Sequence, residues 1–278
     1  DLHGREHSFP TRRSSDLVRQ FALDGKRYGS LGVINSAYHD DGETLNGYDW
    51  FPLAFGAEAS WNPATADPNV FRPDFSAAFY GDTAGRVSKA VALISEAQNI
   101  MEMEYFADKT YFAWPPAIIS ATPRVARNEA RRCAALMDRA LRNLDAARPD
   151  AVANADNIEY IAFAARRIRA VARHKIAYAE ALDLYSKITP QAKPEDVVYS
   201  LGAIETSLAG IAADTRAELT EYRRLWMAEN RPYFFENNEK KYRAFIAKID
   251  AARRAAADAK SAYIASGRLP KSKEDLGL

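Results

Sequence analysis

The sequence predicts a mostly helical protein in which one strand and one helix precede an antiparallel bundle of long helices. Apolar residues recur at three- and four-residue intervals over residues 161–185, 201–226 and 242–263. Prolines such as Pro194 and Pro232 stand between these segments, where they would break a continuous helix. Because each stripe must bury its apolar face, we expect the long helices to pack against one another.

The first 17 residues are set apart from this fold. They read DLHGREHSFPTRRSSDL, which matches the translation of a common short-read sequencing adapter except at Gly4, Arg5 and Glu6, where the adapter carries its variable index. The run has no apolar core long enough for a signal peptide. We interpret residues 1–17 as an adapter-derived artefact and expect the authentic chain to begin near Val18, without its natural N-terminus.

Composition indicates an ordinary soluble globular protein of one or two domains. The 278 residues are 47% hydrophobic and 27% charged, and the formal net charge of +1 gives no general attraction to nucleic acid or anionic membrane. A single cysteine, Cys133, excludes an internal disulfide framework. No apolar stretch approaches the roughly 20 residues of a membrane-spanning helix.

The segment 18–82 differs from the rest of the chain in its glycines and its many aromatic residues. Residues 31–37 form a short apolar run whose length and branching predict a buried strand. A polar loop over 39–44 and an apolar helix over 50–61, ended by an Asn-Pro pair, complete one strand–helix unit. A lone strand leaves its hydrogen-bonding groups unpaired, so we expect this unit to be the remnant of a larger sheet.

The segment 83–278 is predicted to be an α-helical C-terminal domain. In addition to the three striped segments, a helix is expected over 123–147, with Thr122 as its N-cap and Pro123 at its first position. Cys133 lies within this helix, where a small buried residue is the simplest interpretation.

Two stretches, 32–43 and 49–61, carry the functional hint. They read Gly-Val-Ile-Asn-Ser-Ala-Tyr-His-Asp-Asp-Gly-Glu and Asp-Trp-Phe-Pro-Leu-Ala-Phe-Gly-Ala-Glu-Ala-Ser-Trp. The first resembles the last barrel strand of family 20 glycoside hydrolases, the β-N-acetylhexosaminidases, where the pattern is Gly-Val-x-x-x-x-Trp-x-Glu. The second resembles the helix that follows, and 223–233 looks like a segment of the helical tail in bacterial relatives. The matching helix positions are Pro52, Leu53, Ala57, Glu58 and Trp61.

This resemblance implies a fold and a reaction. Residues 18–82 would be the truncated end of a (β/α)8 barrel, namely its last strand and helix, followed by a C-terminal antiparallel helical bundle. Barrel enzymes build their sites at the C-terminal ends of the strands. The parent protein would remove terminal N-acetylhexosamine from a glycan or glycoconjugate by substrate-assisted retaining hydrolysis.

The resemblance also implies which residues contact the sugar. The aromatic residue after the last strand walls the sugar pocket of the family, and the acidic residue two positions later binds sugar hydroxyls. These positions are Tyr38 and Asp40, where the family has tryptophan and glutamate. Asp41, Glu43 and Trp50 complete the predicted substrate-binding set. An aromatic face stacks on a pyranose, and carboxylates accept hydroxyl hydrogen bonds.

The family's catalytic pair is missing. Family 20 enzymes use adjacent aspartate and glutamate residues on the fourth strand, and no Asp-Glu dipeptide occurs in this sequence. The reversed pairs, 195–196 and 274–275, stand near predicted helix starts, where acidic residues suit the helix dipole. We therefore expect the fragment alone to be inactive, and we expect neither a metal nor an organic cofactor.

Simpler interpretations exist for several of these residues. Asp40, Asp41 and Glu43 flank a glycine and could form a turn or a helix cap. A metal site involving His39 is weak because no regular ligand spacing accompanies it. Trp61, at a helix end before Asn-Pro, is expected to be a core residue.

The basic run 166–175 could indicate nucleic-acid binding. However, its charges lie around a helix whose other face is apolar, and the neighbouring predicted helices contain a comparable number of acidic residues. We expect a solvated face there, with His174 at the surface, and no nucleic-acid partner. Two alternatives to the hexosaminidase remain: a glycosidase with another sugar specificity, and a non-catalytic helical module that binds carbohydrate or protein. The resemblance suggests a secreted or periplasmic location.

Overall fold

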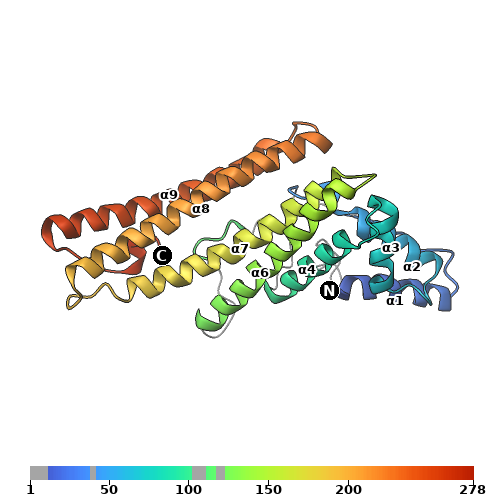
Figure 1. Ribbon diagram of the computed structural model, residues 1–278, viewed down its shortest axis with the longest axis horizontal. Coiled ribbons are helices and arrows are strands. Elements are labelled where there is room, and N and C mark those ends of the chain that lie inside the picture. The colour runs from blue at the N-terminus through green and yellow to red at the C-terminus, as the bar shows by residue number, and fades with distance from the viewer. Residues whose placement is uncertain (1–11, 38–41, 102–110, 117–122) are drawn as a thin grey trace. The chain divides into compact units, whose positions relative to one another are not determined.

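The computed structural model describes residues 12–37, 42–101, 111–116 and 123–278, and every regular element in these ranges is a helix (Figure 1). The predicted helical bundle is therefore confirmed. The α-helices are α1 (Arg12–Arg27), α2 (Trp50–Trp61), α3 (Pro68–Tyr80), α4 (Arg86–Met101), α6 (Pro123–Ala147), α7 (Asn157–Tyr185), α8 (Pro194–Glu229) and α9 (Phe235–Ser266). Short 3-10 turns are η1 (Asn46–Tyr48), η2 (Arg148–Asp150) and η3 (Lys273–Leu276).

The chain forms two compact units that do not follow the predicted boundary after residue 82. Unit 1 comprises Asp1–Ala107 and Arg132–Arg169, and unit 2 comprises Asp108–Arg131 and Ala170–Leu278. The division passes through α6 and α7, so each of these helices contributes residues to both units. Composition along the chain cannot reveal a unit boundary that falls inside a helix, because α6 and α7 are each continuous across it.

Helix ends follow local sequence signals. Helix α2 spans the predicted residues, and α8 begins at Pro194, whose missing N–H is not needed at a first helical position. Asp67 caps α3 by accepting a hydrogen bond from the backbone N–H of Asn69 at 2.8 Å. Gly81 ends α3 with φ +77°, and a Cβ at this position would lie 2.4 Å from Val152 Cγ2.

Unit 1 has an aromatic core between α2 and α3. Phe51 and Phe55 are buried on α2, and Phe71 and Phe75 of α3 pack against them. The ring centroids of Phe51 and Phe75 lie 5.5 Å apart in an edge-to-face arrangement. The dense aromatic residues of this segment therefore serve first to bind two short helices together.

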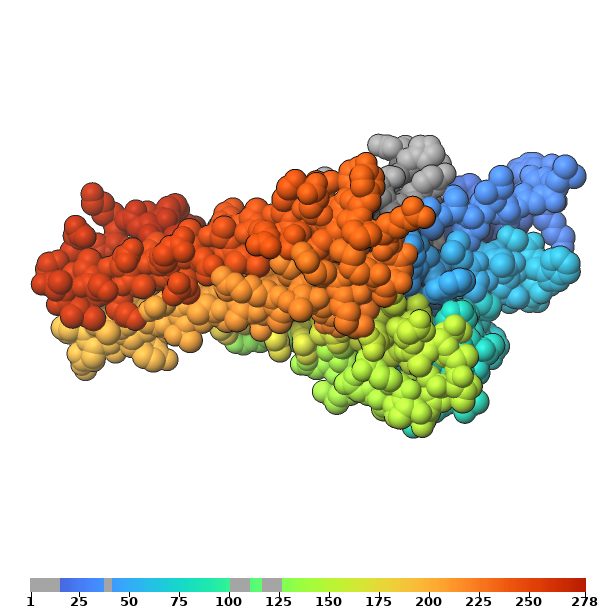
Figure 2. Space-filling model, turned by 90° about the horizontal axis from the view of Figure 1, so that it is seen from above, coloured from blue at the N-terminus to red at the C-terminus, as the bar shows by residue number. Residues whose placement is uncertain are grey.

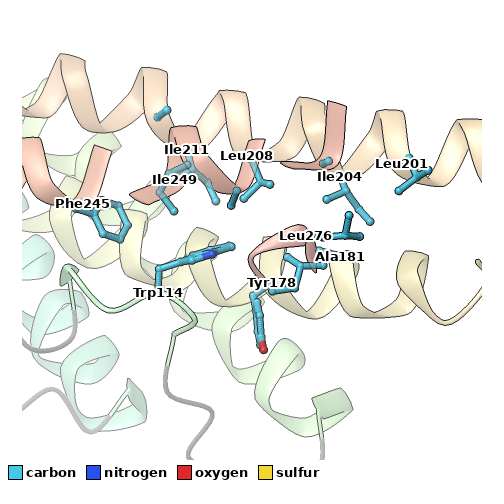
Figure 3. Packing of buried hydrophobic residues seen from close by; sticks show 14 of the residues in the cluster. Trp114, Tyr178, Ala181, Leu201, Ile204, Leu208, Ile211, Phe245, Ile249 and Leu276 are labelled. Atoms are coloured by element: carbon cyan, nitrogen blue, oxygen red, sulfur yellow. The ribbon is translucent and has the colours of Figure 1, made fainter. Parts of the chain in front are cut away.

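Unit 2 is organised around α8 and α9, which pack antiparallel along their length (Figures 1 and 2). Figure 3 shows side chains of both helices pointing into one space, together with Trp114 and with Tyr178 of α7. The two helices supply the following buried residues to this core: Val197, Leu201, Ile204, Leu208, Ile211, Ala212, Phe245, Ile249, Ala252 and Ala256. The predicted three-four stripes are confirmed by this burial.

The predicted strand is not formed. Residues 31–37 belong to no helix or strand, and Leu31 and Ile34 are 109% and 94% exposed. Within the described ranges, the backbone groups of this segment pair with no other backbone group. The prediction of a buried strand is therefore wrong for this chain, because a strand needs a neighbouring ladder to satisfy its backbone and cover its side chains.

The basic run 166–175 is also corrected. Arg167, His174 and Lys175 are 1%, 3% and 7% exposed, so the expectation that His174 lies at the surface is wrong, whereas the Arg173 side chain, at 52% exposure, is solvated as expected. Their spacing explains the burial: these residues lie three or four positions from Ala164, Val171 and Tyr178, on the inward face of α7. The burial of these three residues is therefore decided by their positions on α7, although their side chains are polar or charged.

We expect Ile204→Ala to lower the free energy of unfolding by about 2–4 kcal/mol, because it opens a cavity in the α8–α9 core. Urea denaturation followed by circular dichroism measures this loss. Tyr199→Ala is the control on the same helix, since Tyr199 is 70% exposed, and its effect should stay within about 0.5 kcal/mol. Equal effects of the two substitutions would contradict the assigned core.

Candidate functional site

The structure describes part of the predicted sugar-contacting set. Tyr38, Asp40 and Asp41 lie outside the described residues, as does His39. Glu43 and Trp50 are described, and both belong to unit 1. The geometry of the candidate site therefore comes from these two residues and from the segments on either side of residues 38–41.

Glu43 lies in the interior of unit 1. Its Oε2 is 3.4 Å from Nη2 of Arg167 on α7, and each side chain is only 1% exposed. An ion pair this far from water is favourable only when both partners are present, because either charge alone would be strongly desolvated. Glu43 thus has a structural role, and the prediction that it contacts sugar is wrong.

A second polar contact holds the chain just after Glu43. Asn157, at the start of α7, donates through Nδ2 to the carbonyl of Gly47 at 2.7 Å and accepts from the Tyr80 hydroxyl at 2.6 Å. Burial raises the pKa of Tyr80 well above its ordinary value, so its hydroxyl stays protonated and donates. Gly47 itself leaves no room for a side chain, since a Cβ would lie 2.6 Å from the Tyr160 ring.

On the other side of residues 38–41, Asn35 attaches the extended segment to α2. Its Nδ2 donates to the carbonyl of Pro52 at 3.3 Å and lies 3.5 Å from that of Leu53. The contact needs Gly56, because a Cβ there would come within 1.9 Å of Asn35 Nδ2. Residues 38–41 are therefore flanked on both sides by segments fastened to the helices of unit 1.

Trp50 is the residue of this site that presents a large surface to solvent. It stands at the first position of α2, is 53% exposed, and its ring centroid is 5.7 Å from that of Phe79 on α3. Phe79 thus lies beside the indole, and about half of the Trp50 surface stays open to solvent. Contact of Trp50 with a sugar remains a prediction.

Trp61 was expected in the core, but it is 86% exposed at the last position of α2, so that expectation is wrong. Trp61 is the last residue of α2, just before Asn62-Pro63, and a side chain at a helix end has fewer neighbouring side chains to bury it. Its exposure makes it a useful comparison for Trp50.

A small pocket lies beside Trp50. It is formed by α2, α3, α4 and α7 in unit 1 and has a volume of about 10 Å³, enough for one water molecule. Trp50, Arg72 and Tyr80 are among the residues that line it. This pocket is too small to hold a sugar ring.

Sequence reasoning missed Arg167 as a site-supporting residue and His174 as a buried one. His174 lies in unit 2 with its ring centroid 5.2 Å from that of Phe245 and 5.8 Å from that of Tyr111. Burial lowers the pKa of His174 to about 4, so it is neutral at pH 7. The helical spacing of both residues within the apolar stripe of α7 was the available signal.

Both acidic pairs lie at helix starts, as predicted. Glu195 and Asp196 occupy the first turn of α8, where they suit the helix dipole without capping the helix through a side-chain hydrogen bond. Asp275 closes a capping box with Ser272 at the start of η3 and accepts a hydrogen bond from the backbone N–H of Lys271 at 2.8 Å. Cys133 is buried, as expected.

The chain matches no known protein-family model, no curated protein and no solved structure. Among the helices of the described ranges, none combines the length and apolarity needed to cross a bilayer. In the same ranges, histidine, cysteine, aspartate and glutamate side chains form no group of three or more that could hold a metal ion.

We expect Glu43→Ala to destabilise the protein by about 3–5 kcal/mol, because it removes a buried carboxylate from the ion pair with the buried Arg167 guanidinium. Urea denaturation measures the loss. The double substitution Glu43→Leu with Arg167→Met should recover part of it by removing both charges. Glu180→Ala is the control, since the Glu180–Arg131 pair is about half exposed and should contribute at most about 1 kcal/mol. Similar effects at Glu43 and Glu180 would contradict the buried pair.

We expect His174 to make the protein less stable in acid. Its pKa of about 4 in the folded chain is below the ordinary value of about 6.5, so the unfolded chain binds the proton more tightly. Its contribution to stability is complete above pH 6.5 and is lost as the pH falls toward 4. In His174→Phe, the free energy of unfolding should fall less between pH 7 and 4.5. An unchanged pH dependence would contradict this assignment.

Proposed function

We propose that this chain is part of a glycoside hydrolase related to family 20, whose parent protein removes terminal N-acetylhexosamine from glycans. The observation that carries the proposal is that residues 31–37 form no regular element and expose apolar side chains. They present Leu31 and Ile34 to solvent, directly before the loop and helix that resemble the end of the family's barrel. An extended apolar segment with one side fastened to a helix is what a barrel strand would leave behind without its neighbours.

In the parent protein, residues 31–37 would pair as the last strand of a (β/α)8 barrel, with α2 as the helix that follows. The hydrogen bond from Asn35 to the Pro52 carbonyl supports this arrangement, because it already holds the segment against α2. Residues 38–41 would then lie at the C-terminal end of the strand, on the face where barrel enzymes bind substrate.

The contribution of this chain to the reaction would be to bind and orient the sugar. The exposed face of Trp50 suits stacking on the apolar side of a pyranose, and the acidic residues Asp40 and Asp41 suit hydrogen bonds to its hydroxyls. The buried Glu43–Arg167 pair would hold the chain directly after residues 38–41 in the parent protein. The general acid and the group that orients the 2-acetamido oxygen would come from the missing Asp-Glu pair of the parent.

Two other functions stay open, each favoured by one observation. Tyr38 and Asp40 replace the tryptophan and glutamate of the family pattern, which favours a glycosidase of different sugar specificity. The helices that make up every regular element of the described ranges favour a non-catalytic helical module that binds carbohydrate or protein.

The test is hydrolysis by the parent protein after its upstream sequence has been restored. We expect that protein to release nitrophenol from p-nitrophenyl N-acetyl-β-glucosaminide, and the present 278-residue chain to release none. In the parent, Trp50→Ala should lower kcat/KM by about tenfold, equal to about 1.4 kcal/mol of lost stacking. Trp61→Ala is the matched control and should leave kcat/KM unchanged.

The outcomes separate the three functions. Release from another glycoside, but not from N-acetylhexosaminides, would favour the glycosidase of different specificity. An upstream region without seven strand–helix units and an Asp-Glu pair, together with no hydrolysis, would favour the binding module.

A further inference from the structure

The position of the Trp50 indole depends on two segments that lie far apart in the sequence. Its backbone follows the 3-10 turn η1, where Asp49 N–H donates to the Asn46 carbonyl at 3.0 Å. Its ring lies beside that of Phe79 on α3, with the centroids 5.7 Å apart. The orientation of the indole is therefore set by how η1 and the end of α3 are held.

Asn157, the first residue of α7, contacts both segments. Its Nδ2 donates to the carbonyl of Gly47 in η1 at 2.7 Å, and its Oδ1 accepts from the hydroxyl of Tyr80, the neighbour of Phe79 in α3, at 2.6 Å. Asn157 is 6% exposed, so both bonds are largely shielded from water. Because an amide carries a donor and an acceptor in one plane, a single side chain joins η1 to α3.

The turn η1 also packs directly on α7. A Cβ at Gly47 would lie 2.6 Å from Cγ of Tyr160, so the backbone of η1 rests against that ring. Tyr160 follows Asn157 by three positions, on the same side of the helix. The start of α7 thus holds η1 by a hydrogen bond and by close packing.

The end of α3 is fixed as well. The Tyr80 carbonyl accepts from Val152 N–H at 2.9 Å, and the Tyr80 side chain is buried. The ring of Phe79 lies 4.9 Å from that of Tyr80, edge to face, and 4.9 Å from that of Phe75, nearly parallel to it. These contacts leave Phe79 little freedom to move away from the Trp50 indole.

We propose that Asn157 is a positioning residue for Trp50. Its two hydrogen bonds connect the backbone that leads into Trp50 with the helix whose Phe79 lies beside the indole. This connection fixes which part of the indole faces solvent. Asn157 is itself buried, so it acts on a ligand through Trp50. The consequence for sugar binding rests on the function proposed above.

The first test observes Trp50 in the present chain and needs no ligand. Acrylamide quenching of tryptophan fluorescence measures how open an indole is to solvent, and the contribution of Trp50 is the difference between chains with and without Trp50→Phe. Asn157→Ala should raise the quenching constant of this contribution while circular dichroism shows a folded chain. Asn143→Ala is the matched control, because Asn143 also donates from Nδ2 to a carbonyl, that of Arg139 at 3.0 Å, but at an exposed site on α6.

A milder variant keeps this test decisive where Asn157→Ala fails to fold. Tyr80→Phe removes only the hydroxyl that donates to Asn157 and retains the ring that packs on Phe79. It should also raise the quenching constant of Trp50, by less than Asn157→Ala does. A Trp50 quenching constant that stays unchanged in the folded variants would overturn the positioning role.

The second test is a double-mutant cycle on hydrolysis of p-nitrophenyl N-acetyl-β-glucosaminide by the parent protein. With Trp50 present, Asn157→Ala should lower kcat/KM by about fivefold, through a higher KM at unchanged kcat. In the Trp50→Ala background the same substitution should have no effect. Asn157→Gln, which keeps a donor and an acceptor, should recover part of the loss.

The two tests separate positioning from a purely structural role and from the proposed function. Equal factors for Asn157→Ala with and without Trp50 would show that Asn157 does not act through the indole, and would overturn the proposal. Absence of nitrophenol release by the parent would count against the proposed function alone, because the quenching measurement requires no substrate.

Discussion

The burial of α7 is the constraint on which the rest of the structure depends. This helix of 29 residues contributes Ile158, Ile161 and Ile168 to unit 1 and Val171, Tyr178 and Ala181 to unit 2. The six consecutive residues 160–165 are all buried, so the helix is covered on every side there. Arg167, His174 and Lys175 are inside because they lie at positions of α7 that neighbouring segments cover, whatever their chemistry.

Those buried polar residues determine what else must be present. A buried guanidinium requires a carboxylate, and Glu43 supplies it from the segment that precedes α2. The same segment is held by Asn157 at the start of α7. In this way a packing requirement of one long helix fastens residues 43–47, the segment that leads into α2. Within this stretch of chain, Glu43 is buried and Trp50 is exposed to solvent.

The aromatic residues show a similar division. Most of them form cores, such as the Phe51–Phe75 contact of unit 1 and the Tyr222–Phe235 contact of unit 2. Trp50, Tyr233 and Phe234 are large rings left accessible beside well-packed neighbours. Exposure of these rings forgoes the hydrophobic stabilisation that their burial would give.

The sequence by itself determined α2 and the four long helices α6, α7, α8 and α9, because apolar spacing, proline positions and caps are local properties that act within a few residues; α1, α3 and α4 were not predicted. The bounds of α2 and α6 and the stripes of α7, α8 and α9 could all be predicted in this way. Only the tertiary structure decided that residues 31–37 form no strand within the described part of the chain, that Glu43 is buried against Arg167, and that Trp61 and Phe234 face solvent. These outcomes depend on which distant segments are present to cover a side chain or pair with a backbone, and local spacing carries no information about such partners.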